Sequence, residues 1–239
     1  GGPRGWQGSL RVGNRSSSET RWSGRVDGTH NELGGRSLSV GGTVSFRPDP
    51  RWELSVTPSY IRSIEAQQYV TALDGGRSET YGTRYVFARI DRTTWSTQLR
   101  ATFTFMPDLN LDVYAEPFAA SGRYHDYGEL LQPGSLARLA YGTSGTTVEL
   151  LPDGSRIVTA GVSDFVIRNN DFNVLSFRSN VVLRWEWRPG TTMFFVWQQS
   201  RQRRQTISTP VGLSDLWGSL TEPGSNILLL KASFWIPVR

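Results

Sequence analysis

Apolar and polar residues alternate along long stretches of this 239-residue chain. In the segment 37–47, Leu38, Val40, Val44 and Phe46 take alternate positions, with Gly42 between them, while serine, glycine, threonine and arginine fill the other positions. A period of two places all the apolar side chains on one face of an extended strand. The segment is therefore predicted to be a strand with one apolar face and one polar face.

The same alternation recurs along the chain and predicts an all-β protein. The regular segments are 52–60, 95–105, 109–116, 177–188 and 228–234, and shorter ones lie at 6–13 and 21–29. Less regular strand candidates are 68–73, 85–90 and 156–168. The pattern predicts about ten to twelve strands. The interval from Asp49 to Asp108 holds either two strands with one long loop or four strands, and four are favoured.

Short turns that contain proline follow several of these segments. SFRPDPRW at 45–52, FMPDL at 105–109 and WRPG at 187–190 each place an aromatic residue before a proline, and FWIP at 234–237 repeats the arrangement. Proline, glycine and aspartate favour tight reversals. Aromatic residues gather where a strand leaves the apolar layer of a membrane. The turns are therefore predicted to share one rim of a sheet.

Longer connections, rich in glycine, serine, threonine and charge, lie between these turns at 65–83, 122–155 and 201–225. Short turns on one side and long loops on the other are typical of an outer-membrane β-barrel. Several segments also reach the roughly nine to eleven residues that a tilted strand needs to cross a bilayer. The longest aliphatic run, ILLL at 227–230, is far too short for a membrane helix.

Charged residues fall on the polar faces of the predicted strands. Arg25 and Asp27 share one such face, and Arg178, Arg184 and Glu186 share another. Charge of this kind is costly in a dry core but is stable against water in a barrel interior.

Composition adds little to the assignment of function. The net charge is +5, and Lys231 is the one lysine among 26 basic residues. The arginines are scattered rather than clustered in a long basic run, so no nucleic acid is expected as a partner. Cysteine is absent, which fits a site in the cell envelope but fits many cytosolic domains as well.

Residues suited to catalysis are few. His30 and His125 are the two histidines, and without cysteine they make no zinc-binding set. His125 lies near Asp126 and Glu129 and suggests a metal or acid/base site, although a polar extracellular loop explains this cluster more simply. No catalytic, metal or cofactor-binding residues are assigned, no cofactor is expected, and the chain is not predicted to be an enzyme.

Three other features suggest binding rather than chemistry. The arginines of SRQRRQ, Arg201, Arg203 and Arg204, are candidates for contact with lipopolysaccharide phosphates or an acidic ligand, or else form a solvated loop base. The carboxylates of Asp112 and Glu116 share a strand face and are expected to be solvated. Aromatic residues at strand ends suit either membrane anchoring or sugar stacking: Trp52, Tyr60, Trp95, Tyr114, Trp187 and Trp235.

Three stretches resemble a bacterial family of uncharacterised function that has a C-terminal outer-membrane barrel. They are SVTPSYIRSIEAQQYVTA at 55–72, the run at 84–130 that begins RYVFARIDRTTW, and the run at 171–201 that begins DFNVLSFRSNVV. In that family the barrel commonly follows a module similar to family 9 carbohydrate-binding domains. The resemblance implies that the chain is the C-terminal part of a longer polypeptide, with Gly1 entering partway round the barrel wall. It supplies no catalytic residues.

Together these observations predict one region, residues 1–239, that forms part of an antiparallel transmembrane β-barrel in the bacterial outer membrane, with short periplasmic turns and long extracellular loops. The expected function is binding or uptake of extracellular material such as glycans. The expected partners are outer-membrane lipid and lipopolysaccharide, a glycan ligand, and the N-terminal part of the same polypeptide. A soluble secreted or periplasmic β-sandwich that binds carbohydrate through exposed aromatics remains the alternative.

Overall fold

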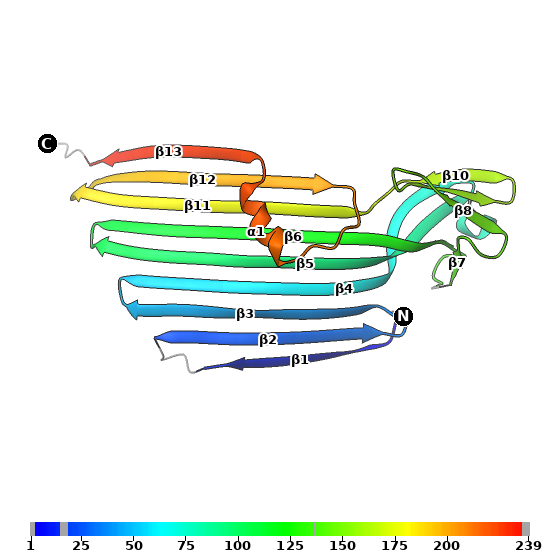
Figure 1. Ribbon diagram of the computed structural model, residues 1–239, viewed down its shortest axis with the longest axis horizontal. Coiled ribbons are helices and arrows are strands. Elements are labelled where there is room, and N and C mark those ends of the chain that lie inside the picture. Colours follow the sequence, from blue (N-terminus) through cyan, green and yellow to red (C-terminus); the bar gives the residue numbers. More distant parts are fainter. Residues whose placement is uncertain (1–2, 15–18, 136, 236–239) are drawn as a thin grey trace.

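A computed structural model describes residues 3–14, 19–135 and 137–235. The chain is all-β and its sheets are antiparallel, as predicted, apart from one short helix and two 3-10 turns. Ten strands form one large sheet, nine of them in the order β1-β2-β3-β4-β5-β6-β11-β12-β13 (Figure 1), while the tenth, β7 (Arg138–Ala140), pairs with β6 off this order. The bounds of the nine are β1 Gly5–Gly13, β2 Thr20–Asn31, β3 Arg36–Asp49, β4 Trp52–Asp74, β5 Thr83–Met106, β6 Leu109–Leu130, β11 Phe172–Arg188, β12 Thr191–Gln205 and β13 Gly224–Phe234.

The three proline-containing turns lie at one end of this sheet, as the sequence predicted. They join β3 to β4, β5 to β6 and β11 to β12, each through two residues. In the last turn Gly190 adopts a φ of 78°, which glycine accepts without strain. We call this end the turn rim. β13 ends there at Phe234, while Ile236 and Pro237 of the FWIP segment lie outside the described residues.

The opposite end, the loop rim, carries the longer connections. The tight turn between β2 and β3 also lies there, and Asn31 organises it: its Oδ1 accepts hydrogen bonds from the backbone N–H groups of Leu33 (3.1 Å) and Gly35 (2.8 Å). Gly34 and Gly35 of the segment GGR at 34–36 belong to this turn, and Arg36 begins β3. A second GGR segment, at 75–77, opens the connection between β4 and β5.

The prediction of four strands between Asp49 and Asp108 is wrong. Two long strands, β4 and β5, span this interval and are joined by residues 75–82, which include the 3-10 turn η1 (Ser78–Thr80). The candidates 68–73 and 85–90 are the ends of these two strands rather than separate elements. Likewise β6 runs on to Leu130, so the connections predicted at 65–83 and 122–155 are shorter than expected.

A small second body, which we call the head, continues the sheet beyond the loop rim. It consists of the far ends of β4, β5 and β6, the strand β7 (Arg138–Ala140) paired to β6, and a separate three-stranded sheet. That sheet contains β8 (Thr146–Leu150), β9 (Arg156–Ala160) and β10 (Ser163–Ile167). The candidate strand 156–168 is therefore a hairpin of two strands, and the described strands number thirteen rather than ten to twelve.

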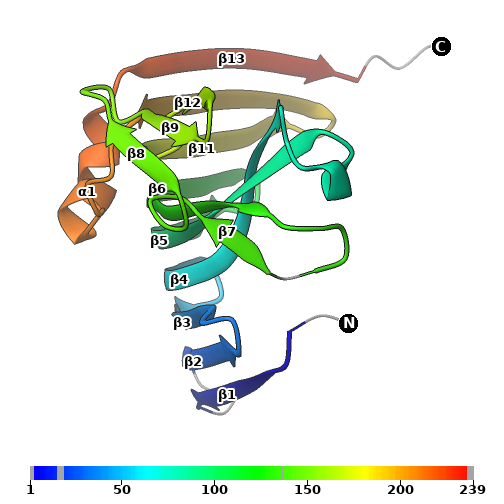
Figure 2. The same cartoon turned by 90° about the vertical axis from the view of Figure 1, so that its right-hand side faces the viewer.

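The head has a dry core of its own. Val86, Ala88, Tyr127, Val158 and Ile167 pack together with almost no exposure. Figure 2, which looks along the sheet from the head, shows β8 and β9 lying across the ends of the long strands. The long strands themselves form a single layer in both views.

The connection between β12 and β13 folds back over the large sheet. It contains helix α1 (Leu213–Gly218) and the 3-10 turn η2 (Ser219–Thr221), which lie across β5, β6 and β11 (Figure 1). Val211 packs on Ala119 and Leu175, and its N–H donates to Ser121 Oγ at 3.1 Å. No helix among the described residues is long and apolar enough to cross a membrane.

Candidate functional site

The two faces of the large sheet differ in chemistry along its whole width. The face that carries Leu38 and Val40 is largely apolar from a slanting edge down to the turn rim. This edge lies at Leu38 on β3, at Tyr60 on β4 and at Trp197 on β12. We call this surface the apolar band. Its residues include Leu10, Val12, Trp22, Val26, Val40, Val44, Phe46, Trp52, Leu54, Val56, Tyr60, Trp95, Leu99, Phe103, Leu111, Val113, Val181, Leu183, Trp185, Phe195, Trp197, Leu228, Leu230 and Phe234.

The apolar band is exposed. Leu10 is 64% exposed and Leu230 is 70% exposed, and most of the other large side chains of the band are exposed by more than a third. Helix α1 and Val211 cover only the loop-rim end of the same face, beside Ala119 and Leu175. A monomer in water rarely exposes an apolar patch of this extent, which is instead typical of a surface that meets another apolar medium.

Aromatic pairs mark both edges of the band. On the loop-rim side, the rings of Tyr60 and Trp95 lie 4.4 Å apart. On the turn-rim side, Trp52 meets Phe103 at 5.4 Å, and Trp187 lies between Trp185 (5.9 Å) and Phe234 (6.0 Å). Of the six aromatics noted in the sequence, Tyr114 lies on the opposite face, and Trp235 lies against Gly190 in the turn.

The band does not run parallel to the rows of hydrogen-bonded residues. One such row joins Leu10, Val26, Val40, Tyr60, Trp95, Ala119, Leu175 and Arg203 across eight strands. Relative to this row, the outermost aromatic of β1, Trp6, lies four positions toward the loop rim. The outermost aromatic of β12, Trp197, lies six positions toward the turn rim.

This shift measures the tilt of the strands against the band. It amounts to about 1.4 residues per strand, and with roughly 3.3 Å per residue and 4.8 Å between strands the tilt is about 44°. The turn-rim edge, followed from Trp22 on β2 to Trp185 on β11, shifts by about 1.2 residues per strand, which corresponds to about 40°. Measured perpendicular to its own edges, the band is about 20–24 Å tall on β4 and β5.

The other face, which we call the polar face, is a lattice of hydroxyls, amides and charges. Thr43 and Thr57 hydroxyls lie 3.2 Å apart, and Thr102 Oγ1 donates to Asp112 at 3.0 Å. The predicted placement of Arg25 and Asp27 is correct: they share this face and form an ion pair at 2.6 Å. Further ion pairs on this face join Arg21 to Glu53 (3.5 Å) and Arg184 to Glu186 (3.2 Å).

Glu116 is the centre of the best-connected group on the polar face. Its carboxylate accepts hydrogen bonds from the Tyr114 hydroxyl (2.7 Å) and the Gln98 amide (3.5 Å). The Arg100 guanidinium lies over the Tyr114 ring at 5.5 Å. Asp112 and Glu116 do share a strand face, but Asp112 bonds to Thr102 rather than to Glu116.

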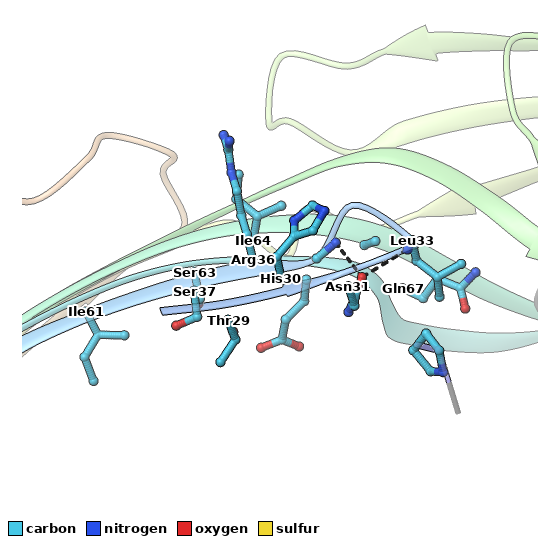
Figure 3. Close-up of a pocket in the computed structure, with 14 residues that line it drawn as sticks. Thr29, His30, Asn31, Leu33, Arg36, Ser37, Ile61, Ser63, Ile64 and Gln67 are labelled. Atoms are coloured by element: carbon cyan, nitrogen blue, oxygen red, sulfur yellow. Dashed lines mark hydrogen bonds between the residues drawn. The ribbon is translucent and has the colours of Figure 1, made fainter. Parts of the chain in front are cut away.

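A hollow of about 630 Å³ lies at the loop-rim end of β2, β3 and β4 (Figure 3). Ser37, Ile61 and Thr29 point toward one side of the sheet in this view, whereas His30 and Arg36 point toward the other. The lining combines hydroxyl, amide and aliphatic groups with the His30 imidazole, the Arg36 guanidinium and the Glu65 carboxylate. Among the described residues, no hydroxyl of this lining is hydrogen-bonded to the imidazole. Such a surface can hold a polar ligand but offers no obvious chemistry.

Only part of the cluster suggested by His125, Asp126 and Glu129 is brought together, because Glu129 lies apart from the other two. His125 contacts Asp91 (Nε2 to Oδ1, 3.2 Å) and Asp126 (Nδ1 to Oδ2, 3.0 Å). Glu129 instead pairs with the buried guanidinium of Arg84 and accepts from the Tyr141 hydroxyl at 3.2 Å. Within the part of the chain that the structure describes, no three His, Asp or Glu side chains are placed to hold a metal ion.

The network around Glu129 lies inside the head and was missed by sequence reasoning. Arg84 also donates to the carbonyl of Gly75 (2.8 Å) and lies 4.2 Å from the centre of the Phe165 ring. Burial raises the pKa of the Tyr141 hydroxyl, and the neighbouring Glu129 charge acts in the same direction. Burial likewise raises the pKa of Tyr127 to about 12. Both pKa shifts result from tight packing inside the head, so these tyrosines have a structural role there.

The arginines of SRQRRQ lie near the end of β12, at the base of its connection to β13. Arg201 donates to the carbonyl of Glu222 (3.0 Å), and Arg203 forms an ion pair with the Glu222 carboxylate (3.2 Å). Arg204 lies on the opposite face, 5.9 Å from the Phe172 ring. These contacts hold the connection between β12 and β13 in place. The tripeptide Asn14-Arg15-Ser16 matches the sequence of a glycosylation acceptor, but residues 15 and 16 lie outside the described part of the chain.

Comparison with known families gives one match. The family described as Domain of unknown function (DUF5916) matches residues 21–239, which include every strand of the large sheet except β1 and the first residue of β2. No curated protein and no solved structure matches the chain. Because the family match covers nearly the whole chain, the protein belongs to the family of the DUF5916 domain of unknown function.

Proposed function

We propose that this chain forms part of the wall of a transmembrane β-barrel in the bacterial outer membrane. In this proposal the apolar band faces lipid, the polar face lines a water-filled interior, and the loop rim with the head lies outside the cell. The barrel binds or takes up extracellular material, with glycan fragments as the expected class. The observation that carries the proposal is the exposed band and its slant across the hydrogen-bonded rows.

The dimensions of the band support a membrane. Barrel strands in outer membranes tilt by about 35–45°, and their lipid-facing band is about 25 Å tall with aromatic residues at both edges. The band of this chain has a tilt of about 40–45° and a height of about 20–24 Å from the spacings of strands and residues. A sheet that packs on another protein layer has no reason to carry an apolar surface of this height at this slant.

The polar face supports a wet interior. Ion pairs such as Arg21 with Glu53 remain partly exposed on a face that no other layer of the described residues covers. Charges of this kind are stable against water, whereas an unhydrated interior would penalise each of them by several kcal/mol. The sandwich alternative requires a second sheet over the apolar band, and no described sheet lies there.

The directions of the edge strands support a wall that continues beyond these nine strands. Among the described strands, β1 and β13 each have one hydrogen-bonded neighbour, and both run from the loop rim to the turn rim (Figure 1). Because they run the same way, direct closure would join them as a parallel pair. An all-antiparallel barrel instead needs an odd number of further strands between them, and we assign these to the N-terminal part of the same polypeptide.

Cysteine accessibility on intact cells that express the full-length protein tests this proposal. The variants Asp49→Cys and Asp108→Cys mark the turn rim, and Ser78→Cys and Thr147→Cys, at exposed positions of the head, mark the loop rim. A membrane-impermeant thiol reagent is expected to label only the loop-rim pair, with little background because this chain has no cysteine. Equal labelling of all four positions, or of none, would reject the assigned topology and favour a soluble sandwich.

A further inference from the structure

A basic hollow lies on the band face just beyond the loop-rim edge of the apolar band. It has a volume of about 530 Å³, and its lining includes Trp6, Gly28, His30, Arg36 and Arg62. It opens on the face opposite to the polar face, so in the proposed barrel it faces the membrane rather than the interior. Its position and its charge together make it a candidate binding site.

The floor of this hollow is apolar. Gly28 has no side chain, and the Trp6 indole lies over it, with Cζ3 at 3.9 Å from the position that a Cβ would take. The Trp6 and His30 rings lie 6.3 Å apart. Leu38 and the buried Ile64 complete the lining on β3 and β4. The floor therefore suits the apolar part of an amphiphile.

Two guanidinium groups stand at the rim of the hollow. Arg36 pairs in register with Ile64, and Leu38 pairs with Arg62, so the two arginines are diagonal neighbours on adjacent strands. Diagonal neighbours have Cα atoms roughly 7–8 Å apart, which lets two long side chains reach one anion. Both arginines are exposed, and among the described residues neither forms an ion pair or a side-chain hydrogen bond.

The charges next to the hollow leave these arginines available. Asp91 is the carboxylate in the same row on this face, opposite Ile64. It already contacts Arg89 (3.9 Å) and His125 (3.2 Å). The net charge of the surface around the hollow therefore favours an anion.

Depth places the hollow at the level of lipid headgroups. Arg62 lies two residues beyond Tyr60, the aromatic at the edge of the band, and Arg36 lies two residues beyond Leu38. With a tilt of about 40–45°, two residues correspond to roughly 5 Å beyond the apolar layer. Phosphate groups are bound best by arginine, which donates two parallel hydrogen bonds.

We infer that this hollow binds the phosphate-bearing headgroup of a lipid in the outer leaflet, of the lipid A type, with Arg36 and Arg62 on the phosphate and Trp6 beside the sugar or acyl part. The inference rests on the proposed function, since it requires the band to face lipid. It uses other arginines than Arg201, Arg203 and Arg204, for which the sequence suggested lipopolysaccharide contact as an alternative to a solvated loop base.

Lipid binding to the full-length protein in detergent tests the inference, with native mass spectrometry to count bound lipids. For the double variant Arg36→Gln/Arg62→Gln, the Kd for bisphosphorylated lipid A is expected to rise at least about tenfold, because two charge-assisted contacts are lost. Dephosphorylated lipid A should bind more weakly than lipid A and show no dependence on the two arginines. Inorganic phosphate should compete only at far higher concentration.

Two further variants control for charge and for folding. Arg178→Gln removes an exposed arginine without an ion pair from the polar face and is expected to leave the Kd unchanged. Arg36→Lys/Arg62→Lys keeps the charge and should retain most of the binding. Unchanged binding in the glutamine double variant, an equal loss in Arg178→Gln, or competition by inorganic phosphate at lipid-like concentration would overturn the inference.

The same samples separate this inference from the proposed function. A heat-dependent gel shift and loop-rim cysteine labelling report whether the protein and its variants are folded barrels in the membrane. A folded, correctly labelled barrel whose lipid binding ignores Arg36 and Arg62 rejects the inference alone. Absence of the gel shift and of the labelling pattern in the unmodified protein rejects the barrel itself.

Discussion

Val56→Arg is the sharpest perturbation of the apolar band. Val56 lies on β4 midway between Tyr60 and Trp52, the aromatics at the two edges of the band, and is 39% exposed. Four residues separate it from each edge, which at a tilt of about 40–45° is about 10 Å in depth. In the proposed barrel this position lies near the middle of the bilayer.

The expected cost depends on depth. An arginine on the lipid face of a barrel destabilises it by about 2–4 kcal/mol at the bilayer midplane and by about 0–1 kcal/mol near the interface. Val56→Arg should therefore lower the free energy of unfolding by about 2–4 kcal/mol. Leu54→Arg, only two residues from Trp52, should cost clearly less, because the guanidinium can reach the interface.

A matched variant on the other face isolates the effect of lipid. Thr57 is adjacent in sequence but points to the polar face, where its hydroxyl lies 3.2 Å from that of Thr43. Thr57→Arg loses this hydrogen bond, at a cost of about 1 kcal/mol, and places its charge in water. The chemistry of the substitution is thus nearly the same, and only the face differs.

The assay is unfolding by denaturant of the full-length protein inserted in phospholipid vesicles, followed by tryptophan fluorescence. The barrel predicts the order Val56→Arg, then Leu54→Arg, then Thr57→Arg, from the most to the least destabilising. A dry protein core instead predicts that Leu54→Arg is as damaging as Val56→Arg, since both side chains would be packed. Equal effects of Val56→Arg and Thr57→Arg would refute the assignment of the two faces.

Two further predictions concern the head. Glu129→Gln leaves the buried Arg84 guanidinium without its charge partner, so the free energy of unfolding of the head should fall by about 3–5 kcal/mol. Hydrogen exchange of residues 84–167 measures this change. The control variant Glu149→Gln, at an exposed position, should leave the exchange nearly unchanged. The pKa of Tyr127 rises from 10.0 to about 12 on folding. The neutral hydroxyl therefore stabilises the folded head fully below pH 10, and about 2–3 kcal/mol of the free energy of unfolding is lost as the pH rises toward 12. Tyr127→Phe should therefore shift alkaline opening of the head to higher pH, as followed by hydrogen exchange against pH, and an unchanged opening curve would contradict this.

The faces of the strands could be predicted from the sequence because they depend only on local parity. Each side chain along 38–46 and 52–60 lies on the face that the alternation predicted. The shared rim of the three proline turns was predictable for a similar reason, since a two-residue turn between antiparallel strands leaves little choice of geometry. Both results need no knowledge of how distant segments meet.

The lengths of β4 and β5 could not be predicted in this way. Register shifts between Glu65 and Gln68 and between Tyr69 and Thr71 interrupt the alternation while the strand itself continues. A bulge adds a residue without ending the ladder, so the sequence pattern breaks where the structure does not. The head also buries residues such as Val86 and Ala88. This part of β5 therefore lacks the alternating polar residues by which a strand with one exposed face is recognised.

The same effect separated the cluster suggested by His125 and Glu129. His125 pairs with Arg89, and Glu129 pairs with Val86, so one extra residue lies in β6 between them. Asp126, with a φ of 52°, lies at this point. A slip of one residue moves every following side chain to the other face. Glu129 therefore turns into the head core while His125 stays on the side of Asp91.

The slant of the band explains why register matters more than composition for this protein. Alternation shows which residues share a face of the sheet. It is the same whether the apolar band runs parallel to the hydrogen-bonded rows or crosses them at an angle, so it cannot show the direction of the band. Only the pairing of the strands shows that Trp6 and Trp197 mark one edge even though they lie ten positions apart against the rows. A level band would suit a flat sheet packed on another layer. A band that crosses the rows at about 40–45° suits strands tilted against a layer of fixed thickness, because a closed barrel requires the register to stagger from strand to strand.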